Sequence, residues 1–192
     1  MSARLFVAVD VGAGDRAALA AWAAGAVERD AGLRLVDEEN IHLTMAFLGH
    51  RALDEIAPLG ALVAGLEPPP ADAAGPPAAP AFSLRTDGAL WLSPRRPHVL
   101  TVAVADESGA LAALHGRLWD ALEEGFGVTR ERRRFRPHLT VARVRKGWTA
   151  PSRGLPPVPE RPLTAQALTL YRSHLGGGPA RYEALVRAPL TA

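Results

Sequence analysis

The sequence predicts an α+β fold with largely antiparallel sheets, and three observations support this prediction. Strand-like segments follow one another in pairs, and three amphipathic segments with helical spacing separate those pairs. No predicted strand leads into a G-x-G-x-x-G or Walker A loop, so dinucleotide and P-loop chemistry have no support. The 192 residues, 48% of them hydrophobic, fit one domain or two small lobes that share a core.

Three segments have the apolar spacing of helices. Residues 15–30 are rich in alanine, with apolar side chains near helical spacing, and Gly32 follows as a stop signal. Residues 53–66 form a second amphipathic segment. Residues 108–124 carry four leucines spaced three, four and four residues apart, which predicts a helix with one apolar face.

The predicted strands are short apolar or alternating runs that end at turn-forming residues. Gly49 is expected to end one of them, and Pro137 is tolerated at the start of another, where a missing N–H costs little. Residues 67–80 are rich in Pro and Ala and are expected to form an extended surface connection. The strands are predicted at 4–10, 33–36, 41–48, 82–92, 98–104, 136–144, 163–171 and 181–187.

The basic residues are unevenly distributed along the chain. The formal net charge is +2, but residues 1–96 carry −4 and residues 97–192 carry +6. Nearly all the positive charge is arginine, which suits bidentate phosphate contacts, and Lys146 is the single lysine. The dense stretch from Arg130 to Lys146 would suit an anionic partner, although such a run is more often a solvated loop than a binding site.

The sequence contains no cysteine, which excludes disulfides, thiolate metal sites and a cysteine nucleophile. No apolar run approaches the roughly 18–20 residues of a membrane span. The opening MSARLFVAVD reaches the acidic Asp10 too soon for a secretory signal. We therefore expect a cytoplasmic protein without a membrane partner, acting as a monomer.

One short element occurs twice. The hexapeptide IHLTMA at 41–46 matches PHLTVA at 137–142, and the two histidines, His42 and His138, are 96 positions apart. A single His-x-Thr on a strand has little meaning, but two copies with matched flanks, half a chain apart, indicate an internal duplication. The other four histidines lack this context and are expected at the surface or the core edge: His50, His98, His115 and His174.

The repeated element has a specific chemistry. Residues i and i+2 of a strand share a face, so His42 lies beside Thr44, and His138 beside Thr140. Imidazole titrates near neutrality, so one histidine can act as base while the other acts as acid. The two hydroxyls can donate to phosphate oxygens as charge develops. This set suits in-line phosphoryl transfer without a metal or other cofactor, since two histidines without a carboxylate cluster make a poor hydrolytic metal site.

At these residues the sequence resembles the two-histidine (2H) phosphoesterase superfamily, and most closely its bacterial RNA 2′,3′-cyclic phosphodiesterases, also called 2′-5′ RNA ligases. The similarity covers nearly the whole chain, in the family's order. The segments that carry it are RLFVAVD, ENIHLTMAFLG, WLSPRRPHVL, FRPHLTVARVRK and LTLYRSHLGGGPARYEAL.

The resemblance implies one bilobal α+β domain over residues 1–192, with two pseudo-twofold related lobes. Antiparallel sheets would flank a central cleft, with helices on the outer faces. The two His-x-Thr elements match the family's motifs, and Arg143 matches a basic position used on the phosphate. The family's usual product is a 2′-phosphomonoester.

The hypothesis that follows is hydrolysis of a 2′,3′-cyclic phosphate at an RNA end or on a small cyclic nucleotide. We expect His138 to activate water and His42 to protonate the leaving O3′. Thr44, Thr140 and Arg143 would stabilise the phosphoryl oxygens.

An aromatic residue and a group of arginines near the motifs are further candidates for substrate binding. Phe47 would wall the site or stack on a base, unless it packs in the core. Arg136, with the neighbouring arginines from 132, would contact RNA phosphates beyond the cyclic end.

Two alternatives remain open at this stage. The same groups could join or cleave 2′-5′ RNA linkages, acting on tRNA halves or oligoadenylates, because the reverse reaction uses the same site. The chain could also be an RNA-end-binding module that has lost catalysis, although both motifs retain His and Thr.

Overall fold

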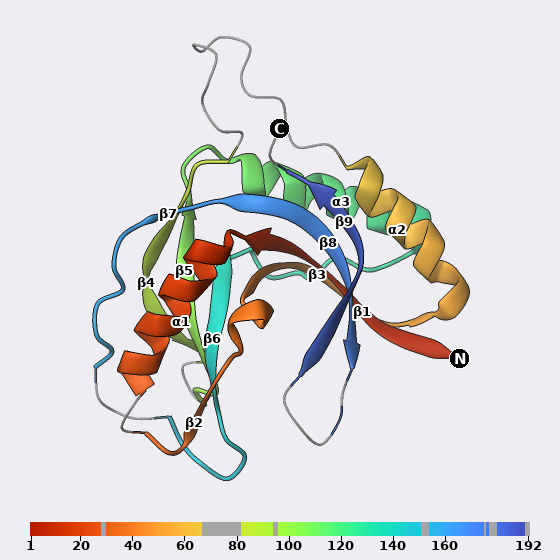
Figure 1. Cartoon of the computed structure of the whole chain (residues 1–192). Coiled ribbons are helices and arrows are strands. Elements are labelled where there is room, and N and C mark those ends of the chain that lie inside the picture. The colour runs from red at the N-terminus through yellow and green to blue at the C-terminus, as the bar shows by residue number, and fades with distance from the viewer. Residues whose placement is uncertain are drawn as a thin grey trace, which may run out of the picture.

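Strands from across the chain form one antiparallel sheet in the computed structural model, which describes residues 1–27, 30–66, 82–93, 96–150, 154–174, 176 and 180–190. The sheet is strongly curled, and the helices lie outside the curl (Figure 1). The strands are β1 Ser2–Val11, β2 Leu33–Leu35, β3 His42–Ala52, β4 Leu84–Leu92, β5 Val99–Asp106, β6 His138–Val144, β7 Pro162–Leu163, β8 Ala165–His174 and β9 Arg181–Pro189. The helices are α1 Ala13–Val27, α2 Ile56–Gly65 and α3 Ala110–Phe126, with short 3-10 turns at Glu38–Asn40 and Leu53–Glu55.

The strand order divides the sheet into two matching halves. The order is β7-β4-β5-β6-β3-β1-β8-β9, with β2 added on β6. Counted outward from the centre, one half runs β3-β1-β8-β9 and the other β6-β5-β4-β7. In each half a helix connects the two innermost strands, α1 between β1 and β3, and α3 between β5 and β6. This arrangement is the one expected from an internal duplication, and the predicted α+β class is confirmed.

The halves meet where β3 runs antiparallel to β6 through the residue pair Leu43 and Leu139. Both leucines are fully buried. The resemblance implies antiparallel sheets that flank a cleft, and in this structure the sheets of the two halves join into one continuous sheet. The motif strands touch at this pair and diverge beyond it, which opens the concave face between the halves.

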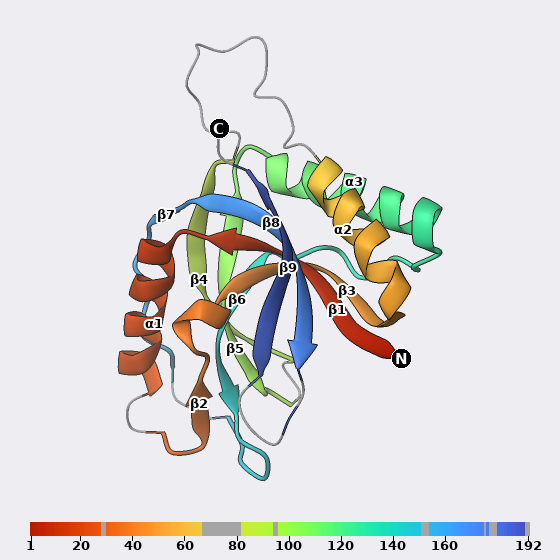
Figure 2. The same cartoon turned by 45° about the vertical axis from the view of Figure 1, so that its right-hand side comes forward.

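The main core lies on the convex face of the sheet, under the helices. Alternate residues of β1, namely Leu5, Val7 and Val9, belong to this core together with Leu19 of α1 and Leu59 of α2. The four leucines that predict α3 are also completely buried in it. Helices α2 and α3 lie side by side in both views, with α1 at the other end of the sheet (Figure 2). Burial of these apolar faces leaves the opposite, concave face for polar side chains.

The predicted elements are confirmed with small shifts of their ends, apart from one correction. Strand β3 does not end at Gly49 but continues to Ala52. Gly49 has φ +69° and follows Leu48, which is an extra residue opposite the step between Leu5 and Phe6 of β1. A glycine in the left-handed region lets the strand bulge rather than stop. The expected connection at 67–80, and residues 28 and 29 near the end of the first predicted helix, lie outside the described residues.

No helix in the described part of the chain is long and apolar enough to cross a membrane.

Candidate active site

Each motif strand carries a β-bulge directly after its threonine. In β3, Thr44 pairs with Ala8 and Ala46 with Val7, so Met45 is an extra residue. A bulge reverses the alternation of side chains beyond it. Phe47, three residues past Thr44, is therefore exposed on the same concave face as the motif, whereas a regular strand would bury it.

The second motif strand repeats this geometry. In β6, Thr140 pairs with Thr101 and Ala142 with Leu100, so Val141 is the extra residue. Arg143 consequently lies on the face of Thr140 and is exposed there. The matched bulges thus place Phe47 in one half and Arg143 in the other at equivalent positions beside the motifs.

The register at the sheet centre crosses the two motifs. Because Leu43 pairs with Leu139 in antiparallel strands, His42 lies across from Thr140, and Thr44 lies across from His138. All four side chains are half-buried and belong to the concave face. Each histidine therefore lies diagonally opposite the other, with a threonine of the other motif as its neighbour.

A cavity of about 390 Å³ lies over this crossing. It is lined by both histidines and both threonines of the motifs, and by Phe47 and Arg143. Six of the seven site residues predicted from the sequence are thus brought together. The remaining lining residues include further polar side chains from other elements, among them Arg34, Asp37, Asn40 and Tyr182.

Arg136, the seventh, has its side chain exposed and does not line the cavity. Its contribution is instead through the backbone, because its carbonyl oxygen lies 2.8 Å from Nδ1 of His138. A carbonyl can only accept, so Nδ1 carries the proton and donates. The neutral imidazole is then left with its lone pair on Nε2, the atom that can take a proton from water.

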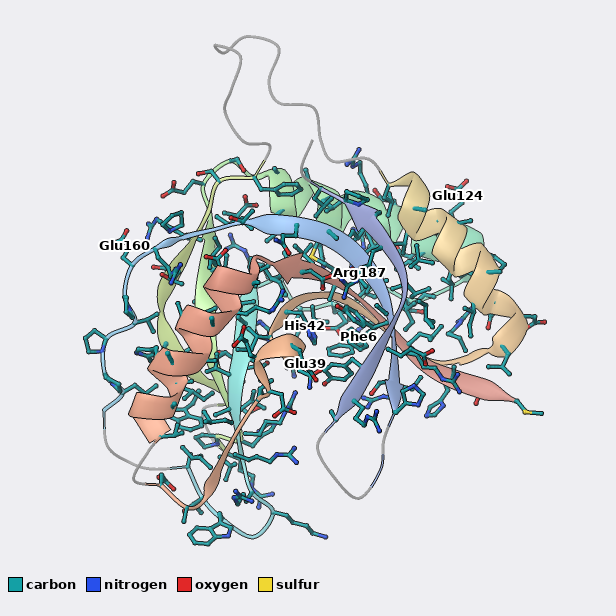
Figure 3. All side chains as sticks on the ribbon, in the orientation of Figure 1. Phe6, Glu39, His42, Glu124, Glu160 and Arg187 are labelled. Carbon is teal, nitrogen blue, oxygen red and sulfur yellow. The ribbon has the colours of Figure 1, made fainter. Side chains whose placement is uncertain are left out.

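His42 is enclosed by aromatic rings. Phe6 stacks on the imidazole with ring centroids 5.0 Å apart, and Tyr182 contacts it edge-on at 5.3 Å. Phe6 and His42 are seen side by side in Figure 3. These rings form a small separate apolar cluster on the concave face, built around Phe6, Ala8 and Tyr171.

This environment shifts the protonation of His42. Burial lowers its pKa to about 4, because the charged imidazolium loses its hydration. The Asp10 carboxylate and the hydrogen bond to the Asn40 carbonyl raise the pKa, while the positive charge of Arg143 and the proximity of His138 lower it slightly further. His42 is therefore neutral at pH 7 in this environment.

Asp10 is a buried carboxylate on β1, directly across from His42. Thr169 donates to its Oδ2 at 2.8 Å and Tyr171 donates to its Oδ1 at 2.7 Å. Arg187 is 3.8 Å from Oδ2. Burial, followed by the hydrogen bond and charge of Asp10, raises the pKa of Tyr171, so its phenol remains a donor. The network keeps one negative charge fixed beside His42.

The sequence analysis does not identify Asp10, Phe6 or Tyr182 as site residues. Asp10 ends the apolar run of the first predicted strand, and a charged residue at such a position could have indicated a role. The aromatic contacts give no such signal, because they join β1, β3 and β9, which pair only through long-range register.

The remaining four histidines lie outside this cavity, as expected. His50, His98 and His174 are exposed, and His174 lies 2.8 Å from Glu183. His115 is half-buried on α3, where it stacks on Phe135. Among the described residues, no group of three or more His, Asp or Glu side chains is placed to hold a metal ion.

Comparisons with known proteins show the family to which the chain belongs. The sequence model of the 2′-5′ RNA ligase superfamily matches residues 16–177. The RNA 2′,3′-cyclic phosphodiesterase of Escherichia coli (strain K12) is 30% identical over 98% of this chain and 97% of its own length. That of Geobacillus stearothermophilus is 32% identical over 81% of this chain and 47% of its own length.

Solved structures show the same relationship. TT0787 of Thermus thermophilus superposes with a TM-score of 0.74, at 29% identity and 97% coverage of both chains. E. coli LigT complexed with 3′-AMP superposes with a TM-score of 0.71, at 27% identity over the full length of both. The chain belongs to the 2′-5′ RNA ligase superfamily, the two-histidine phosphoesterases that its paired motifs resemble.

Proposed function

We propose that the protein is an RNA 2′,3′-cyclic phosphodiesterase, which opens a 2′,3′-cyclic phosphate to a 2′-phosphomonoester. The observation that carries this proposal is the cavity in which two His-Thr pairs cross diagonally, with Arg143 beside them. Relatives that cover nearly the whole chain are named for this activity, which supports the same assignment.

The reaction needs one water and two proton transfers. His138, with its proton held on Nδ1 by the Arg136 carbonyl, accepts a proton from water through Nε2. The water oxygen forms a bond to phosphorus as the bond from phosphorus to O3′ breaks. His42 gives its proton to O3′, so the product carries a 2′-phosphate and a 3′-hydroxyl. Solvent then resets the two imidazoles.

The acid role of His42 requires that it gain a proton when substrate arrives. Burial holds its pKa at about 4, but a phosphate anion in the cavity would favour the imidazolium. Asp10, fixed across the strand, acts in the same direction. Substrate binding is therefore coupled to proton uptake at His42, and the desolvated imidazolium that results is a strong proton donor.

The developing negative charge lies between the two halves. The hydroxyls of Thr44 and Thr140 can donate to the non-bridging oxygens, one from each motif. Arg143 adds a positive charge from the second half. These groups act through position and charge, which is what phosphoryl transfer mainly requires.

The nucleoside is expected on the side of the first half. Phe47 is 57% exposed although it is a large apolar residue, and it lines the cavity together with Tyr182. An exposed ring next to a phosphate site suits stacking on a base, which is tolerant of base identity. Phe47 is accordingly a binding residue in this proposal rather than a core residue.

The decisive experiment is a product assay on a panel of substrates. It contains cyclic mononucleotides, an oligoribonucleotide with a 2′,3′-cyclic end and a 2′-5′ linked dimer, each with and without EDTA. We expect 2′-phosphate products from the cyclic substrates, with EDTA having no effect. A 3′-phosphate product, or activity that EDTA removes and a divalent ion restores, would contradict the mechanism.

The family to which the chain belongs also suggests a second activity, the joining of RNA ends by a 2′-5′ linkage. Ligation is the reverse chemistry, with a 5′-hydroxyl in place of water, and uses the same imidazoles. Incubation with tRNA halves that carry a 2′,3′-cyclic phosphate and a 5′-hydroxyl distinguishes the two. Tight RNA binding without turnover of any substrate would instead favour a binding module.

We further propose that the protein acts as a monomer, since one chain supplies every group named above. The compartment that we propose is the cytoplasm. Sedimentation equilibrium at assay concentrations tests the oligomeric state.

A further inference from the structure

A second cavity lies beside the active site and has no role in the reaction described above. Its volume is about 540 Å³, and it is lined by residues 96–98 and 144–150. Three of these lining residues are basic, Arg96, Arg145 and Lys146, and none is acidic. Trp148 also lines it and is 56% exposed, which is unusual for an indole.

The two cavities adjoin along one pair of strands. Val99 of β5 pairs with Arg143 of β6, and both line the active-site cavity. The next residues, His98 and Val144, line the second cavity and are joined by a 2.9 Å hydrogen bond from the Val144 N–H to the His98 carbonyl. One strand step of roughly 3.3 Å separates the two linings. The two cavities are therefore neighbours at this end of β5 and β6.

Trp148 is held in place by the backbone around Gly32. A Cβ atom at Gly32 would lie 2.7 Å from Cε3 of the indole, so the ring rests directly on the glycine. The Arg145 N–H donates to the Gly32 carbonyl at 2.7 Å, and the Trp148 N–H donates to the Arg145 carbonyl at 3.0 Å. The turn that carries the indole is thus fixed to the start of β2.

We propose that this second cavity binds the RNA strand on the 5′ side of the cyclic end. A base stacks on Trp148, and backbone phosphates lie next to Arg96 and Lys146. The inference rests on the proposed function, which places the cyclic phosphate in the adjoining cavity. An exposed aromatic ring among cations with no acid is the combination that binds single-stranded nucleic acid without regard to sequence.

A consequence is that the enzyme distinguishes an RNA end from a free cyclic mononucleotide, which cannot reach Trp148. The ratio of kcat/KM for a cyclic-ended tetranucleotide to that for the cyclic mononucleotide measures this difference. Loss of one stacked base corresponds to about a tenfold loss of affinity or more. We expect Trp148→Ala to lower the ratio about tenfold and Trp148→Phe to restore most of it. Lys146→Ala is expected to lower it less and to reduce the salt dependence by about 0.7 in log–log slope.

Two substitutions serve as matched controls. Leu53→Ala removes another exposed apolar side chain, and Arg117→Ala removes a cation on α3. Neither residue lines either cavity. Both variants should keep the wild-type ratio. Gly32→Ala, which leaves Trp148 present but displaces its ring, should reproduce the effect of Trp148→Ala.

Direct binding separates this inference from the proposed function. Fluorescence anisotropy of a labelled oligoribonucleotide with a 3′-phosphate requires no turnover. Weaker binding by about tenfold in Trp148→Ala supports the cavity even if no cyclic phosphate is hydrolysed. If the wild-type protein hydrolyses cyclic ends but Trp148→Ala and Lys146→Ala change neither the ratio nor the dissociation constant, the inference is wrong while the proposed function stands.

Discussion

The two halves of the molecule present the same motif in different electrostatic surroundings. His42 lies across from Asp10, whereas the equivalent pair in the second half is His138 with Ala103. Each imidazole is hydrogen-bonded to the backbone carbonyl two residues before it, but His42 is in addition enclosed by Phe6 and Tyr182. Duplication thus gives identical reactive groups, and the neighbouring strands make them different.

The residues beyond the bulges differ in the same way. The equivalent positions carry an aromatic ring, Phe47, in the first half and a cation, Arg143, in the second. A cyclic nucleotide has an apolar base and an anionic phosphate. An aromatic ring on one side of the site and a cation on the other match these two parts of the substrate. In the proposed mechanism, the first half binds the nucleoside and protonates the leaving group, and the second half activates water and binds charge.

The largest expected effect comes from removing either imidazole. His42→Ala and His138→Ala should each reduce kcat/KM on a 2′,3′-cyclic substrate by about 10²–10⁴, the usual contribution of general acid or base catalysis. Circular dichroism and thermal unfolding should show that both variants fold. Activity near that of the wild type in either variant would exclude the two-histidine mechanism.

A substrate with sulfur in place of O3′ should give different activities for His42→Ala and His138→Ala. A thiolate leaves without protonation, so it needs no acid. His42→Ala should then recover most of its activity, whereas His138→Ala should remain impaired because water still needs a base. The opposite pattern would exchange the roles of the two histidines.

Local sequence predicts most of the elements of this fold and the core of the site. The spacing of leucines in 108–124 and the repeated His-Leu-Thr are local patterns, and each is confirmed in position. The face on which Arg143 lies is not a local property, because simple alternation places it opposite Thr140. The bulge at Val141 corrects this, and it depends on pairing with β5.

Other parts of the site depend on contacts between distant segments. Asp10 meets Thr169 and Tyr171 only because β8, near the end of the chain, pairs with β1. The second cavity joins the segments at 96–98 and 144–150, with Gly32 beneath Trp148. No spacing in the sequence indicates these contacts, since the register of distant strands is set by the packed core.

A further prediction concerns the two residues beyond the bulges, Phe47 and Arg143. Arg143→Ala should lower kcat by about 10²–10³, the cost of losing one group that stabilises transition-state charge. Phe47→Ala should mainly raise KM, by about tenfold, because stacking is the same in the ground and transition states. Steady-state kinetics on one cyclic mononucleotide measures both. Equal effects on kcat from the two variants would mean that the halves do not divide the substrate as described.

The smallest expected effect concerns stability rather than catalysis. The unfolded chain protonates His42 below a pKa of about 6.5, but the folded protein does so only near pH 4. The unfolded state therefore binds more protons as the pH falls through this window, and stability falls with it. His42 should account for a loss of up to about 3 kcal/mol between pH 7 and pH 4. Urea unfolding from pH 7 to pH 4 should show that the free energy of unfolding falls less steeply for His42→Gln than for the wild type. His138→Gln keeps the enclosed His42, so its free energy of unfolding should fall as steeply as that of the wild type. If the free energy of unfolding depends on pH in the same way for the wild type and His42→Gln, the aromatic enclosure does not lower the pKa of His42.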